Sequence, residues 1–138
     1  MVVTSEITLN TRGHCDIRNI TSEVAQAVAS SQMENGTVTI FCPGATGALT
    51  TVEYESGTLA DLQAVFDEIA PADRDYHHGI RSGDDNGHSH VRAALIGPSL
   101  TVPFINRKLT LGTWQQIVFF DFDTRARARR LILQMIGQ

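Results

Sequence analysis

Short runs of β-branched, aromatic and alternating apolar residues recur along most of the chain, and they restrict its fold more than any other feature. The runs expected to form strands are at 2–9, 14–17, 37–41, 49–54, 88–95, 100–104, 109–111 and 115–122. Two segments, 22–32 and 59–69, carry apolar residues at helical spacing instead. Both helices lie in the first half, so strands follow one another without a regular β-α-β alternation. The pattern predicts an α+β fold, an antiparallel β-sandwich or barrel with two helices.

The arginine-rich segment 125–136 fits either a strand or a helix. Arg125, Arg127 and Arg129 alternate with alanines, which favours a strand with the three arginines on one face. Such arginines could bind phosphate or nucleic acid, or they could pair with acidic groups and line a groove. A net charge of −4 argues against nucleic acid as a partner, because nucleic-acid binders carry an excess of basic residues.

Length and composition describe one globular unit. A chain of 138 residues with 42% hydrophobic and 19% charged residues has the size and composition of one domain, 1–138. No apolar run reaches the roughly 18 residues of a membrane span, and the start of the sequence lacks the pattern of a signal peptide. The expected location is the cytoplasm, with the thiols of Cys15 and Cys42 reduced and no membrane partner.

The segment 76–116 concentrates the residue types that carry chemistry. It holds four of the five histidines, two adjacent aspartates and the only tryptophan. If 88–95 is a strand, His88 and His90 project from the same face. Together with Asp84 and Asp85 in the preceding turn, they could supply ligands to a divalent metal. The alternative is a solvated polar turn whose Asp and Asn side chains bond to their own backbone.

Two features of the first half are candidates for contacts with a ligand. The glycine-containing loop 42–48 follows a strand, so its backbone amides could cradle a phosphate, although a simple tight turn explains the glycines equally well. Glu53 stands in the expected strand 49–54. If its carboxylate faces the core it requires a partner, and if it faces solvent it carries little information. The polar stretch 72–87 is long for a connection inside a compact domain and is expected to be functional or mobile.

Two blocks of the second half resemble a known family. The runs GDDNGHSHVRAALIGPSLTVPF and LGTWQQIVFFDFD resemble the YjbQ family, long uncharacterised and also labelled secondary thiamine-phosphate synthase. The resemblance extends over nearly the full chain. It implies a β-sandwich with two helices, a homotrimer and a metal-containing cleft.

The resemblance also implies roles for individual residues. His78 and His90 match family histidines, His88 stands where many members carry Asp, and Glu53 matches an acid at a strand end. Gly44 departs from the family, since many members have a histidine after the loop proline, so this chain resembles a glycine subgroup. The implied metal ligands are His78, His88 and His90, the implied catalytic residues are Glu53 and His90, and the implied phosphate contacts are Gly44, Thr46, Gly47 and Arg92.

The activity implied by the resemblance joins a hydroxymethylpyrimidine diphosphate to a thiazole phosphate and releases pyrophosphate. A divalent metal, Zn or Mg, would neutralise the leaving diphosphate. The expected partner is therefore a small phosphorylated substrate. Two alternatives stay open: a metal-assisted hydrolase of a small substrate, and a non-catalytic trimeric protein that binds a small ligand.

Overall fold

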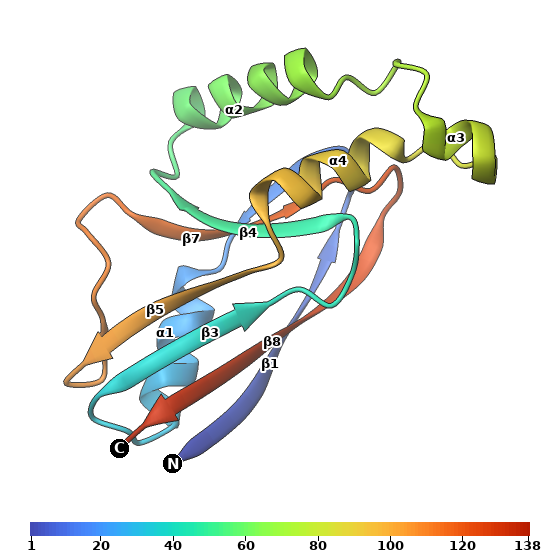
Figure 1. Ribbon diagram of the computed structural model, residues 1–138. Coiled ribbons are helices and arrows are strands. Elements are labelled where there is room, and N and C mark those ends of the chain that lie inside the picture. The colour runs from blue at the N-terminus through green and yellow to red at the C-terminus, as the bar shows by residue number, and fades with distance from the viewer.

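A computed structural model describes all 138 residues as eight strands and four helices (Figure 1). In chain order these are β1 (Val2–Thr11), β2 (Asp16–Asn19), α1 (Thr21–Ser30), β3 (Gly36–Phe41), β4 (Gly47–Val52), α2 (Ser56–Ile69), α3 (His77–Ser82), α4 (Gly87–Ile96), β5 (Ser99–Ile105), β6 (Lys108–Leu109), β7 (Gln116–Asp121) and β8 (Arg127–Gly137). No helix of the chain has both the length and the apolar character needed to cross a membrane.

The strands form two antiparallel sheets. One has five strands in the order β1-β8-β3-β5-β6, and the other has three in the order β2-β7-β4. The main core lies between them and includes Ile40 and Leu133 of the larger sheet, Phe119 of the smaller one, and Val24 and Val28 of α1. The architecture confirms the predicted α+β fold with antiparallel sheets.

Strand β7 is buried on both faces within the chain itself. Ile117 and Phe119 face the main core, whereas Val118 and Phe120 belong to a second cluster that includes Phe66 of α2. The helices α2 and α4 thus cover the outer face of the smaller sheet, as Figure 1 shows. The two-sided apolar character of this strand therefore reflects burial inside one chain.

The C-terminal segment is a strand, as its alternation predicts. Leu131, Leu133 and Met135 are fully buried, whereas Arg130 and Gln134 are exposed. Strand β8 lies between β1 and β3, with Thr11 paired to Arg127 and Ile40 paired to Leu133. A burial period of two residues along a central strand is the expected signature of a sheet with one face in the core.

The segment 88–95 is a helix, and the predicted strand there is wrong. In α4 the buried residues include His88, Ser89, Arg92 and Ala93. Arg92 follows Ser89 by three residues and His88 by four, and these intervals place side chains on one face of a helix that packs against a sheet. A short mixed run does not distinguish the two periods, and Ala93, Ala94 and Leu95 favour a helix intrinsically. The preceding polar stretch also holds a short helix, α3, so the chain has four helices rather than two.

Candidate functional site

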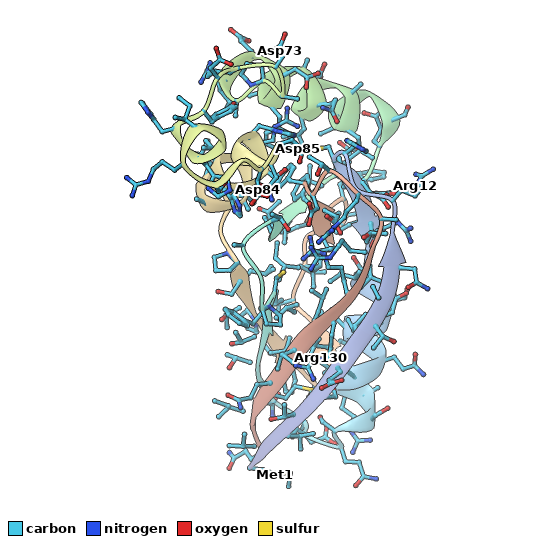
Figure 2. The ribbon with its side chains drawn as sticks, turned by 90° about the vertical axis from the view of Figure 1, so that its right-hand side faces the viewer. Met1, Arg12, Asp73, Asp84, Asp85 and Arg130 are labelled. Carbon is cyan, nitrogen blue, oxygen red and sulfur yellow. The ribbon has the colours of Figure 1, made fainter.

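Three connections meet at one end of the sandwich and enclose a cavity of about 540 Å³. They are the loop between β3 and β4, the α3–α4 connection and the turn between β7 and β8. Figure 2 shows Asp84 and Asp85 of the α3–α4 connection at this end of the molecule, opposite Met1. The lining residues are Gly44, Ala45, Thr46, Asp84, Asp85, Asn86, His90, Asp123, Thr124, Arg125, Arg127 and Arg129.

A buried ion pair forms the floor of this cavity. Arg129 of β8 donates from Nε to Asp121 Oδ2 at 2.7 Å and from Nη2 to Asp121 Oδ1 at 2.8 Å, and Thr11 donates a further hydrogen bond to Oδ2. Burial alone would raise the pKa of Asp121, but the hydrogen bonds from Arg129 and Thr11 outweigh it and lower that pKa. The pair is therefore charged, with both oxygens of Asp121 occupied.

The ion pair holds the loop between β3 and β4 in place. Arg129 Nη2 also donates to Thr46 Oγ1 at 2.7 Å, and Thr46 Oγ1 donates to Asp123 Oδ2 at 3.3 Å. Asp123 in turn accepts a hydrogen bond of 2.5 Å from Arg127 Nη1, and the amide of Phe122 donates to the carbonyl of Thr46 at 2.9 Å. The loop wall of the cavity is thus tied to β7 and β8 by side-chain and backbone bonds.

His90 presents one free nitrogen on the cavity wall. Its Nδ1 lies 3.0 Å from the carbonyl oxygen of Ala45. Because a carbonyl only accepts hydrogen bonds, Nδ1 carries the hydrogen, and Nε2 is left to exchange a proton or hydrogen bond with a ligand. The imidazole of His78 packs edge-on against His90 with ring centroids 4.6 Å apart, and its Nε2 lies 3.1 Å from Asn86 Oδ1.

Of the predicted metal ligands, His78 and His90 lie side by side, but His88 does not join them. Residues two apart on a helix point about 200° apart, so His88 faces the protein interior while His90 faces the cavity. His88 is 6% exposed and its Nδ1 has no hydrogen-bond partner. Burial, and then the positive charge of Arg92, lower the pKa of His88 and favour its neutral form. No three His, Cys, Asp or Glu side chains in the chain are arranged to hold a metal ion, so this ligand set does not fit.

Arg92 does not reach the cavity, which corrects its predicted contact with phosphate. It is buried between α2 and α4, where Nε donates to the carbonyl of Ala70 at 3.0 Å and Nη2 to Asp67 Oδ1 at 3.1 Å. Its guanidinium also lies 5.8 Å from the ring centroid of Phe66. Because α4 is a helix, Arg92 shares the inner face with His88 instead of pointing the way His90 does.

Of the other predicted residues, Gly44 and Thr46 line the cavity, whereas Gly47 and Glu53 do not. Gly47 begins β4, and a Cβ there would lie 2.7 Å from the Phe119 ring, so this glycine is required for packing. Glu53 is exposed in the connection that follows β4, which places its carboxylate in solvent. Its predicted catalytic role therefore has no support from this geometry.

Four further residues line the cavity without having been predicted as site residues: Arg125, Arg127, Arg129 and Asp123. Arg127 and Arg129 lie on one face of β8, as alternation along a strand requires, and both pair with acids while lining a groove. That possibility was readable from the Arg-Ala-Arg-Ala-Arg spacing. Nothing in the sequence indicated which aspartates they meet, because Asp121 and Asp123 lie in a different strand and turn.

The chain is similar to proteins of one family along nearly its whole length. Residues 5–138 match the family model described as UPF0047 protein YjbQ-like. A UPF0047 protein of Methanothermobacter thermautotrophicus is 37% identical over 99% of this chain and 94% of its own length. The UPF0047 protein YugU of Bacillus subtilis is 32% identical over 86% of this chain and 88% of its own length.

Solved structures agree with these relatives. A YbjQ-like protein of unknown function from Sulfolobus solfataricus has a TM-score of 0.94 and 29% identity, with 100% of this chain and 99% of that chain covered. An uncharacterised YjbQ/UPF0047 family protein from Clostridium acetobutylicum has a TM-score of 0.87 and 33% identity, with 96% and 99% covered.

Proposed function

The chain belongs to the YjbQ-like UPF0047 family, and we propose that it is an enzyme that joins a hydroxymethylpyrimidine diphosphate to a thiazole phosphate at the cavity described above. In this reaction the thiazole nitrogen attacks the methylene carbon of the pyrimidine. The carbon–oxygen bond to the diphosphate breaks, and pyrophosphate leaves with the bonding electron pair. The products are thiamine phosphate and pyrophosphate.

The observation that carries the proposal is the meeting of His90 and three arginines at one cavity. Negative charge grows on the diphosphate as its bond to carbon breaks, and fixed cationic donors stabilise such charge. Arg125 is exposed in the turn before β8, and Arg127 and Arg129 follow it within β8. All three line the cavity. The cavity therefore offers an environment suited to a phosphorylated small molecule.

His90 has the geometry of a proton donor to the leaving group. The bond from Nδ1 to Ala45 fixes the ring and persists whether or not Nε2 is protonated. When Nε2 carries a proton, it can deliver that proton to the departing pyrophosphate, a role for which histidine is suited near neutral pH. Positioned proton transfer of this kind contributes about 10²- to 10⁴-fold to rate.

The test is formation of thiamine phosphate from the two phosphorylated substrates by purified protein, with and without added Mg²⁺ or Zn²⁺. His90→Ala is expected to lose about 100-fold or more of the rate, as loss of a general acid predicts. His77→Ala is the matched control, because His77 is exposed on α3 and does not line this cavity. Equal rates in His90→Ala and in the unaltered protein would contradict the role of His90.

Absence of product above a reaction without protein would overturn the synthase proposal. Release of phosphate from small phosphate esters in the same assay would then identify a hydrolase. Binding of such esters without turnover would identify a non-catalytic ligand-binding protein.

A homotrimer is proposed on the family resemblance and on one exposed apolar stripe. Val91 and Leu95 are four residues apart on the outer face of α4 and are 39% and 61% exposed. An apolar stripe at helical spacing on an outer face suits contact with another copy. Light scattering is expected to give about three times 15.1 kDa, and a mass of one chain across a concentration range would refute the trimer.

A further inference from the structure

Arg129 leaves one of its three nitrogens without an acceptor in the protein. Its Nε and Nη2 are both occupied, by Asp121 and Thr46, whereas Nη1 donates to no protein atom. The side chain is only 6% exposed. Nη1 is not among the buried side-chain atoms that lack a partner, so it keeps contact with solvent, and an acceptor from outside the chain can reach it at the cavity that Arg129 lines.

The space next to Nη1 is kept open by a glycine. A Cβ added to Gly44 would lie 3.2 Å from Arg129 Nη1, closer than ordinary van der Waals contact. The backbone of Gly44 is not left-handed, so conformation alone does not demand glycine at this position. Gly44 and Arg129 line the same cavity, and the missing side chain therefore leaves the approach to Nη1 clear.

The buried carboxylates around this point are already paired, so an anionic oxygen at Nη1 would meet no unmatched buried negative charge. Asp121 is matched by Arg129, and Asp123 is matched by Arg127 at 2.5 Å. The remaining carboxylates of the cavity, on Asp84 and Asp85, belong to the separate α3–α4 connection and are exposed to solvent, which screens them. A planar guanidinium donor held rigidly by its other bonds is suited to a phosphoryl oxygen.

We infer that Nη1 of Arg129, reached past Gly44, is a subsite for one phosphoryl oxygen, and that Gly44 determines access to it. The inference rests on the proposed function for the identity of the anion. The phosphate contact is thereby assigned to Arg129 of β8, beside Gly44 of the β3–β4 loop, and not to Arg92 as the family resemblance had implied.

The experiment is calorimetric titration of the full chain with inorganic phosphate and with pyrophosphate. Gly44→Ala adds only the methyl group that would crowd Nη1, and it is expected to weaken binding of both anions by about tenfold or more, the effect of losing one charge-assisted hydrogen bond. Gly112→Ala is the matched control. Its new Cβ would have an ordinary nearest contact of 3.7 Å, outside the cavity, so binding is expected to be unchanged.

A second measurement needs no variant. In protein labelled with ¹⁵N-arginine, the guanidinium resonances of Arg129 are expected to shift on addition of phosphate. A shift of Arg125 alone, with Arg129 unmoved, would place the anion at the rim and overturn the inference. Equal phosphate affinity in Gly44→Ala and the unaltered protein, or no phosphate binding by the unaltered protein, would also overturn it.

Failure of this inference can be told apart from failure of the proposed function. If phosphate binds and Gly44→Ala weakens it, but no thiamine phosphate forms, the subsite stands and the synthase activity falls. If Gly44→Ala makes thiamine phosphate at the full rate with unaltered Michaelis constants, the activity stands and the subsite falls.

Discussion

The cavity floor and the joint between α2 and α4 are each built around one buried arginine, but the two arginines are used differently. Arg129 is paired with Asp121, whose side chain is 0% exposed, and one nitrogen is left facing Gly44. Arg92 is paired with Asp67, whose side chain is 62% exposed, and it also bonds the carbonyl of Ala70 at the end of α2. The first arrangement keeps a donor for a ligand, whereas the second joins two helices.

The difference shows that burial of an arginine does not by itself mark a binding site. Arg92 has its charge matched at the protein surface, where water also solvates Asp67. Arg129 has its charge matched in the interior, so the pair depends wholly on its own geometry. The following changes test this contrast, from the largest expected effect to the smallest.

Asp121→Asn is expected to cost about 3–5 kcal/mol of unfolding free energy, because it leaves the buried charge of Arg129 without its counter-ion. Urea denaturation measures the loss. Glu6→Gln is the control, since Glu6 pairs with Arg130 on the same strand β8 but both side chains are exposed. That exposed pair is expected to contribute less than about 1 kcal/mol.

The double variant Asp121→Leu with Arg129→Met sharpens the same contrast. It removes both charges together, so its unfolding free energy is expected to exceed that of Asp121→Asn, as apolar replacement of a buried pair often does. Phosphate binding is nevertheless expected to be lost. If the double variant were less stable than Asp121→Asn, the ion pair and its hydrogen bonds would stabilise the fold by more than an apolar pair does.

Arg92→Met is expected to destabilise the chain by about 1–3 kcal/mol, because the buried carbonyl of Ala70 loses its donor. No charge is left buried, since Asp67 is exposed. Phosphate titration should give the affinity of the unaltered protein. A large loss of phosphate affinity with the fold intact would reverse the assignment of Arg92 to packing.

Acidification should affect the two regions at different pH. Burial, and then the charge of Arg92, lower the pKa of His88, so below its ordinary value of 6.5 the unfolded chain takes up a proton that the folded chain resists. Unfolding free energy should therefore fall as pH drops below about 6.5, and His88→Gln should remove that fall. His14 adds to the effect of Arg92 on His88, and Asp85 opposes it.

The contribution of Asp121 to the unfolding free energy is lost only at lower pH. Its folded pKa lies below the ordinary value of 3.8, so its stabilisation is complete above that pH and is lost as pH falls through the folded pKa. Denaturation curves between pH 7 and 3 measure both regions. If the unfolding free energy of His88→Gln still fell below about pH 6.5, the assignment of that fall to His88 would be contradicted. His77→Gln, at an exposed residue of α3, is the control variant.

Asp67→Asn is expected to have the smallest effect, below about 1 kcal/mol, because the carboxylate is solvated and Arg92 keeps its bond to Ala70. Thermal denaturation of Asp67→Asn and Asp121→Asn under the same conditions compares the two losses of stability. Equal losses in the two aspartate variants would remove the distinction between the regions.

The sequence was most informative where one face of a strand is buried. The alternation of arginine and alanine at 125–129 favoured a strand, and β8 (Arg127–Gly137) confirms it, with every second side chain buried from Arg129 to Met135. Alternation failed at 88–95, where His88 and His90 suggested a strand although the burial of Arg92 and Ala93 follows a helix. A run of eight residues with few large apolar side chains carries too little periodicity to decide.

The candidate site was predictable only in part for a related reason. His90, Gly44 and Thr46 line one cavity, whereas His88 and Arg92 lie on the inner face of α4, because the segment predicted as a strand is a helix. The pairing of Arg129 with Asp121 depends on how β7 and β8 meet across the sandwich, which no local pattern encodes.

The network at the cavity floor also constrains the order in which the protein can fold. It unites Thr11, Thr46, Asp121 and Arg129, and the Thr11–Asp121 bond spans 110 residues of chain. Closing such long loops is entropically costly, so these contacts form after the local helices and hairpins. A ligand that needs the completed floor would recognise only molecules that have finished folding, and its binding would slow their unfolding rather than speed their assembly.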